Sequence, residues 1–196
     1  NTNHNLVGFS FGGKTYSTGV SNTITRSNFD RALSIDKDDS YVELNSAVDD
    51  LVGSDFTLSL WLNIPKSPPA STAYLLSFNP SSSSNQNNLL FGYTDNMDNT
   101  YELRLFHQGS STDQLSGYNL EENIWYYISY TWDGTSIRTF VNGQLVRTDN
   151  ISISGSMISS NDLFSLGQEF DGNANPTNEA AIYVDNLVIW NSAKTA

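Results

Sequence analysis

The chain has 196 residues, a formal net charge of −12 from 21 acidic and 9 basic residues, and no cysteine. Nucleic acids and anionic membranes bind through clustered Lys and Arg, so this charge argues against both as partners. The lack of cysteine removes disulfides, zinc–thiolate sites and cysteine nucleophiles, and it favours a bacterial origin over a secreted animal domain.

In the first half of the chain, short apolar runs alternate with polar turns, and no stretch has the period of a long amphipathic helix. The clearest strand is 56–64, where apolar residues recur at every second position until Pro65 ends the run. An acidic turn at 36–39 separates two predicted strands, and a turn rich in Asn and Asp at 95–99 separates two more. The predicted strands are 6–11, 32–36, 40–44, 56–64, 74–78, 89–93 and 101–106.

The second half contains the strongest hairpin signal, Asn142-Gly143 between residues 138–141 and 144–147. A type I′ turn needs positive φ at both central positions, which Asn and Gly adopt at little cost. Aromatic and β-branched runs at 125–132 and 183–190 predict further strands.

Taken together, about a dozen strands without a fixed repeat predict an all-β fold, a two-sheet antiparallel β-sandwich of jelly-roll type. We expect a single domain over residues 1–196, excised from a larger secreted or surface protein. No apolar run is long enough to insert into a membrane.

The strand sequences resemble a known superfamily. Residues 32–44 and 56–61 are similar to the opening of laminin-G-like, concanavalin A-like jelly-roll domains. Residues 125–143 and 185–191 resemble the closing half of the same domains, so the likeness covers roughly residues 30 to 192. This fold carries lectins, carbohydrate-binding modules, adhesive domains and enzymes, so the resemblance implies the fold more specifically than the ligand.

Within the superfamily, residues 166–171 (Leu-Gly-Gln-Glu-Phe-Asp) look most like the pentraxin branch, in which a Glu-x-Asp after Leu-Gly-Gln supplies calcium ligands. The resemblance implies Glu169 and Asp171 as ligands of Ca²⁺. Pentraxins take further ligands from an Asp-Asn pair before an apolar strand, and Asn87-Asn88 stands in that position here. The two half-cystine positions of pentraxins fall on Ser59 and Ser129.

A second calcium position is implied by other jelly-roll carbohydrate-binding families, where an aspartate opening the last strand holds a structural ion. Asp185 would be that residue. The alternatives stay open: Asp171-Gly172 as a simple turn, Asn87-Asn88 as a solvated loop, and Asp185 as a strand-end residue. The acidic residues in 36–39 lack the glycine and glutamate of an EF-hand loop and are interpreted as a solvated turn.

Sugar binding uses the face of an aromatic ring against a pyranose, with amide and carboxylate hydrogen bonds around it. The candidates near predicted loops or strand ends are Tyr93, His107, Tyr118 and Phe170. Trp61, Trp132 and Trp190 are predicted to belong to the core because they lie in alternating strands, while Trp125 is ambiguous.

Enzyme signatures are weak. No strand carries the paired glutamates of a jelly-roll glycoside hydrolase, and no nucleophile elbow is present. We therefore predict a non-enzymatic, calcium-dependent carbohydrate-binding module of a bacterial extracellular adhesin or polysaccharide-degrading enzyme. It would be a monomeric unit within a larger chain, with an extracellular glycan as partner. The alternative is a calcium-rigidified interaction or spacer domain of a cell-surface adhesin.

Overall fold

The described part of the protein is built mainly from two antiparallel β-sheets, one of seven strands and one of six. Its structure is a computed structural model. The structure describes residues 23–25, 32–35, 40–81, 88–108, 114–153, 155–171 and 175–194. The predicted all-β, two-sheet antiparallel sandwich is confirmed. Within the described residues, no helix is long and apolar enough to cross a membrane. The predicted strand 6–11 and the acidic turn 36–39 fall outside the described residues.

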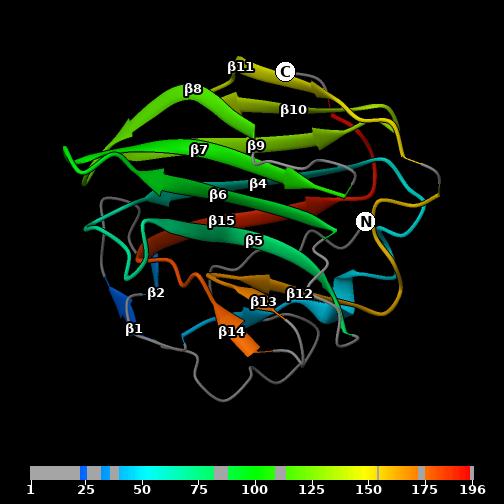
Figure 1. Cartoon of the computed structure of the whole chain (residues 1–196), viewed down its shortest axis with the longest axis horizontal. Helices are drawn as coiled ribbons and strands as arrows, with labels where there is room; N and C mark the ends of the chain where they lie inside the picture. Colours follow the sequence, from blue (N-terminus) through cyan, green and yellow to red (C-terminus); the bar gives the residue numbers. More distant parts are fainter. Residues whose placement is uncertain are drawn as a thin grey trace.

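The seven-stranded sheet contains, in spatial order, β1 (Thr23–Thr25), β2 (Ala32–Ile35), β15 (Ile182–Trp190), β4 (Phe56–Asn63), β9 (Trp125–Trp132), β10 (Ser136–Val141) and β11 (Gln144–Asn150). The six-stranded sheet contains β3 (Val42–Glu43), β12 (Asp162–Leu166), β5 (Thr72–Pro80), β6 (Leu89–Asp95), β7 (Thr100–His107) and β8 (Gln114–Glu121). A short hairpin, β13 (Glu169–Asp171) with β14 (Asn175–Thr177), and a 3₁₀ turn, η1 (Asn45–Ala47), complete the described elements. Figure 1 shows β5 to β8 as one layer over strands of the seven-stranded sheet.

The predicted strands 32–36 and 40–44 form, as β2 and β3, but they lie in different sheets rather than beside each other. Alternation of apolar residues shows that a segment is a half-buried strand, but it does not show which sheet the strand joins. By contrast, the predicted pairing across 95–99 is confirmed, because β6 and β7 run antiparallel from Leu89↔His107 to Asp95↔Tyr101.

The core lies between the sheets and consists largely of Leu, Ile and aromatic side chains. Phe91 of β6 stacks on Tyr130 of β9 with ring centroids 4.1 Å apart, which joins the two layers. Burial raises the pKa of the Tyr130 hydroxyl. Trp132 is 6% exposed and belongs to the core as predicted.

The Asn142-Gly143 hairpin is confirmed between β10 and β11. Asn142 and Gly143 have φ of 51° and 79°, the signs that a type I′ turn requires. Asn142 also fastens the turn to the neighbouring strand: its backbone N–H donates to the Tyr127 carbonyl at 2.7 Å, and its Oδ1 accepts the Tyr127 N–H at 2.9 Å. These two hydrogen bonds fix the position of the hairpin turn along β9.

Candidate functional site

The structure brings two of the predicted calcium segments towards each other. β13 packs against β5, and just before β13 the Gln168 carbonyl accepts 2.8 Å hydrogen bonds from Ser77 of β5 and Ser165 of β12. The Phe170 N–H donates to Asn79 Oδ1 at 3.3 Å. Asn88 lies beside Asn79 in the ladder, because the next pair along β5 and β6 is Phe78↔Leu89. Asn79, which the sequence did not single out, thus lies between Asn88 and Phe170.

At this corner the described oxygens fit a calcium ion in part. The Asn88 side-chain amide donates to Asp162 Oδ2 at 2.6 Å, and both side chains are buried. Burial raises the pKa of Asp162, while hydrogen bonds from the Ser159 N–H and the Asn88 amide act in the opposite direction. A buried carboxylate beside an amide is a suitable start for a calcium site. Asp162 was not among the predicted ligands.

The other predicted ligands do not complete that set. Glu169 is buried, and its negative charge acts on Arg104, whose pKa is lowered by burial and raised in part by Glu169. Asp185 lies on the seven-stranded sheet, in the middle of β15 rather than at its start, where burial raises its pKa. The Asp171 side chain and all of Asn87 fall outside the described residues. Among the described side chains, no group of three acidic or histidine residues converges on one point.

The four aromatic residues predicted to bind sugar do not form one site. Tyr93 is 0% exposed; its ring meets Tyr101 edge-on, and its hydroxyl donates to the Ala181 carbonyl. Burial raises the pKa of Tyr93 and keeps its ring from any bound glycan, so its predicted role is wrong. Phe170 is buried edge-on against Tyr41. His107 and Tyr118 are half-buried on separate strands, β7 and β8.

Two tryptophans predicted to be core residues are instead half-buried on the outer face of the seven-stranded sheet. In β4, Leu58, Leu60 and Leu62 point into the core. Trp61 has the opposite parity, so it faces outwards. Trp190 pairs with Thr57, which also faces outwards. The prediction that Trp61 and Trp190 are core residues is therefore wrong, because alternation fixes two faces and these residues occupy the outer one.

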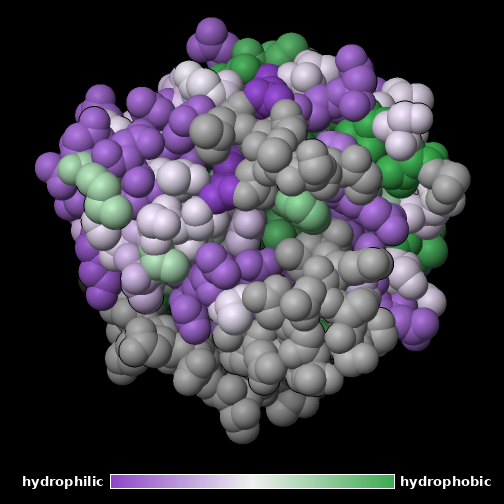
Figure 2. Space-filling view, in the orientation of Figure 1, coloured by the Kyte–Doolittle hydropathy of each residue, from purple (hydrophilic) through white to green (hydrophobic). Residues whose placement is uncertain are grey.

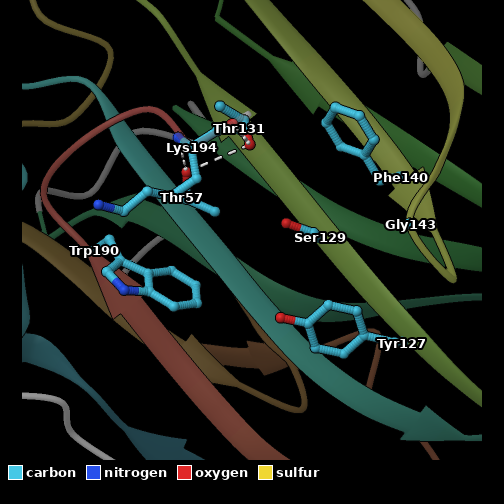
Figure 3. Close-up of a pocket in the computed structure, with 8 residues that line it drawn as sticks. All are labelled: Thr57, Tyr127, Ser129, Thr131, Phe140, Gly143, Trp190 and Lys194. Atoms are coloured by element: carbon cyan, nitrogen blue, oxygen red, sulfur yellow. Dashed lines mark hydrogen bonds between the residues drawn. The ribbon is translucent and has the colours of Figure 1, made fainter. Parts of the chain in front are cut away.

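These residues line an aromatic groove that runs along β9 on the outer face. Figure 3 shows Trp190 of β15 on one side of Ser129 and Phe140 of β10 on the other, with Tyr127 further along the strand. The hollow that they line has a volume of about 250 Å³. Its aromatic residues form the walls, and hydroxyl side chains form the floor. The described residues that line it are Thr57, Tyr127, Ser129, Thr131, Phe140, Gly143, Trp190 and Lys194.

The groove continues past Tyr127 into a second hollow of about 550 Å³, which shares Tyr127 and Gly143 with the first. Trp61, Trp125 and Asn142 are the other described residues that line it. The rings of Trp61 and Tyr127 have centroids 5.4 Å apart. Aromatic surface is therefore present along the whole groove.

The floor is organised by the pairing of β4 with β9. Ser59 and Ser129 are direct register partners, as the pentraxin resemblance implied for two positions that form a disulfide there. Here the Tyr127 hydroxyl donates to Ser59 Oγ at 2.9 Å. Ser129 Oγ makes no hydrogen bond to another described residue, so its hydroxyl is available to a ligand.

One end of the groove is closed by residues 191–194, which we call the strap. The Thr57 hydroxyl donates to the Ser192 carbonyl at 3.1 Å and accepts the Lys194 N–H at 2.9 Å. The Thr131 hydroxyl reaches the Lys194 carbonyl at 3.4 Å. Figure 3 shows Lys194 of the strap next to Thr57 and Thr131, with dashed lines for hydrogen bonds among the residues drawn. The other end, at Trp125, carries no such cover among the described residues.

Charge is nearly absent from the groove. Of the described residues that line the two hollows, only Lys194 is charged, although the chain as a whole carries 21 acidic residues. On the face of the molecule seen in Figure 2, hydrophilic residues predominate among those that are coloured. The groove is therefore suited to a neutral ligand that offers both C–H faces and hydroxyl groups.

Comparison with known proteins identifies the family. A sequence profile described as the concanavalin A-like lectin/glucanases superfamily matches residues 36–196. The chain therefore belongs to this superfamily, as its strand sequences suggested. A search of curated protein sequences found no match.

Several solved structures share the fold. The heptameric SAP-like pentraxin of Limulus polyphemus is 19% identical with a TM-score of 0.58, and the match covers 72% of this chain and 66% of that one. Trypanosoma rangeli sialidase is 20% identical with a TM-score of 0.63, over 90% of this chain but 27% of the enzyme. Domain 4 of the extracellular GH43 arabinanase AbnA from Geobacillus stearothermophilus, solved with arabinotriose, is 18% identical with a TM-score of 0.58, over 93% and 78% of the two chains. The chain thus spans about a quarter of the sialidase, and this domain type occurs in carbohydrate-binding and glycosidase-associated proteins.

Proposed function

We propose that this member of the concanavalin A-like superfamily is a carbohydrate-binding module and that its glycan lies in the aromatic groove. The observation that carries the proposal is the arrangement of Trp190 and Phe140 on the two sides of Ser129. Aromatic faces pack against the C–H faces of sugars, and a hydroxyl between them can exchange hydrogen bonds with sugar hydroxyls. The arabinotriose bound to a domain of the same fold makes arabinan a natural first ligand to test.

A glycan array tests this proposal with a variant that fills the groove. Replacing Ser129 with tryptophan places a large ring on the floor, so we expect wild-type glycan signals to disappear. Ser129→Ala removes one hydroxyl and should retain most of the binding. Thr148→Trp adds the same ring at an exposed position of β11 and controls for non-specific binding by an added aromatic. Glycan signals that survive Ser129→Trp would place the binding site elsewhere.

We further propose that a calcium ion binds beside Asn88 and Asp162, with Glu169, Asp171 and Asn87 as further ligands. What supports this is the buried Asp162 carboxylate next to the Asn88 amide, since a cation would compensate a carboxylate that burial otherwise disfavours. Calcium would act here on the loops of the six-stranded sheet, away from the aromatic groove. Asp185 would hold a separate ion on the other sheet.

Thermal unfolding measures the calcium effect. At a hundredfold excess over its Kd, a bound ion adds about 2.7 kcal/mol, which corresponds to a rise in Tm of roughly 5–10 °C for a chain of this size. We expect EDTA to reverse the rise and Asp162→Asn or Glu169→Gln to abolish it. Asp50→Asn, at an exposed position, should leave it intact. An unchanged Tm with calcium would remove the ion from the proposal.

The biological setting is also a proposal. A groove for neutral glycan, with a fold shared by a domain of an extracellular arabinanase, supports a role as one unit of a bacterial extracellular adhesin or polysaccharide-degrading enzyme. The alternative is a spacer or protein-interaction domain that calcium merely rigidifies. A calcium-dependent Tm together with an empty glycan array would favour that alternative.

A further inference from the structure

The strap makes the two ends of the aromatic groove unlike each other. At the Thr57 and Thr131 row, the hydroxyls of both side chains are engaged by the strap and by each other, at 3.3 Å between the two Oγ1 atoms. A ligand lying along β9 cannot continue past this row without displacing the strap. At the Trp125 end the second hollow opens outwards. The groove is thus closed at one end and open at the other.

The length of the groove exceeds that of one sugar. From Thr131 to Trp125 there are six residues of strand, which is roughly 20 Å at about 3.3 Å per residue. The hollow at the strap end has a volume of about 250 Å³. A single sugar ring would fill the space between Trp190 and Phe140 and would not reach Trp61 or Trp125.

We propose that the groove binds the end of a linear, uncharged glycan chain. The terminal sugar lies between Trp190 and Phe140 over Ser129, against the strap, and the following sugars leave over Tyr127 towards Trp125. This inference rests on the proposed function, but it makes a separate claim: the protein recognises chain ends and not internal stretches. A groove open at both ends would instead bind anywhere along a chain.

Binding stoichiometry separates the two modes. Isothermal titration calorimetry would use three length series of linear neutral oligosaccharides, namely arabinan including arabinotriose, xylan and β-glucan. For a chain-end binder, the number of protein molecules bound per glycan chain stays at one as the chain grows. For a groove that accepts internal stretches, this number rises with chain length. A rising number overturns the inference and leaves the proposed function intact, whereas no heat with any series overturns both.

Two variants sharpen the measurement. Trp125→Ala removes a contact that only later sugars reach, so we expect it to weaken the longest oligomers by about tenfold and to leave the shortest binding oligomer unchanged. Thr57→Val with Thr131→Val removes the strap's hydrogen bonds while keeping the side-chain volume. If this double variant folds, several of its molecules should bind along one long glycan. If Trp125→Ala weakens binding of all oligosaccharide lengths equally, the proposed direction of the glycan in the groove is wrong.

Discussion

Replacing Gly92 with alanine is expected to destabilise the sandwich by about 3 kcal/mol, the upper end of the range for an overpacked site. A Cβ at this position would lie 2.2 Å from the Ala73 carbonyl oxygen and 2.7 Å from Cδ1 of Tyr74. The oxygen belongs to the backbone of β5, which shifts register between Tyr74 and Leu76 and cannot swing aside as a flexible side chain would. Relief of the clash therefore requires β5 and β6 to separate. Urea unfolding monitored by tryptophan fluorescence measures the loss.

Gly143→Ala provides the matched control. No heavy atom lies within 4 Å of its added Cβ, so its cost comes from the positive φ of 79° alone, about 1 to 2 kcal/mol. Because β5 also supports the β13–β14 hairpin, Gly92→Ala should reduce any calcium effect on Tm, while Gly143→Ala should not. If Gly92→Ala proves no more destabilising than Gly143→Ala, the close approach of β5 to Gly92 is wrong.

Local sequence signals predicted the parts of the fold that depend on neighbouring residues. The turn at Asn142-Gly143 follows from the φ angles that these two residues adopt, and the strand at 56–64 follows from its alternation. The assignment of β2 and β3 to different sheets could not be predicted this way, because it depends on where the chain crosses between layers. The sequence predicted that the segments of Asn88 and Phe170 lie close together, but it did not predict that Asn79 lies between them. Asn79 is one polar residue in an otherwise ordinary strand, so it gives no local signal.

The aromatic groove was missed although its signal was present. In β4 the leucines occupy one parity, so Trp61 and Ser59 had to share the other face. In β9 the same parity joins Trp125, Tyr127 and Ser129, and the register pairs Ser59 with Ser129. Two strands that each place aromatic and hydroxyl residues on their outer face predict an amphipathic surface rather than a core. The strap, by contrast, depends on tertiary hydrogen bonds to Thr57 and Thr131 and has no local signal.

Truncation of Trp190 is expected to reduce glycan affinity by about 30-fold, the equivalent of about 2 kcal/mol for a buried aromatic anchor. The ring forms one wall of the closed end of the groove, opposite Phe140, so its loss removes a face from the terminal sugar. Trp190→Phe keeps an aromatic face and should lose less than Trp190→Ala. Calorimetry with the strongest ligand of the glycan array measures both.

Tyr118→Ala is the matched aromatic control, because Tyr118 is also half-buried but belongs to β8 of the other sheet. We expect it to leave glycan affinity unchanged, even where it lowers Tm. A loss of affinity in Tyr118→Ala with none in Trp190→Ala would move the site to the six-stranded sheet. The pair of variants therefore distinguishes a glycan held on the seven-stranded sheet from one held on the six-stranded sheet. Chelation should weaken a glycan held through the calcium ion and leave one held in the aromatic groove almost unchanged.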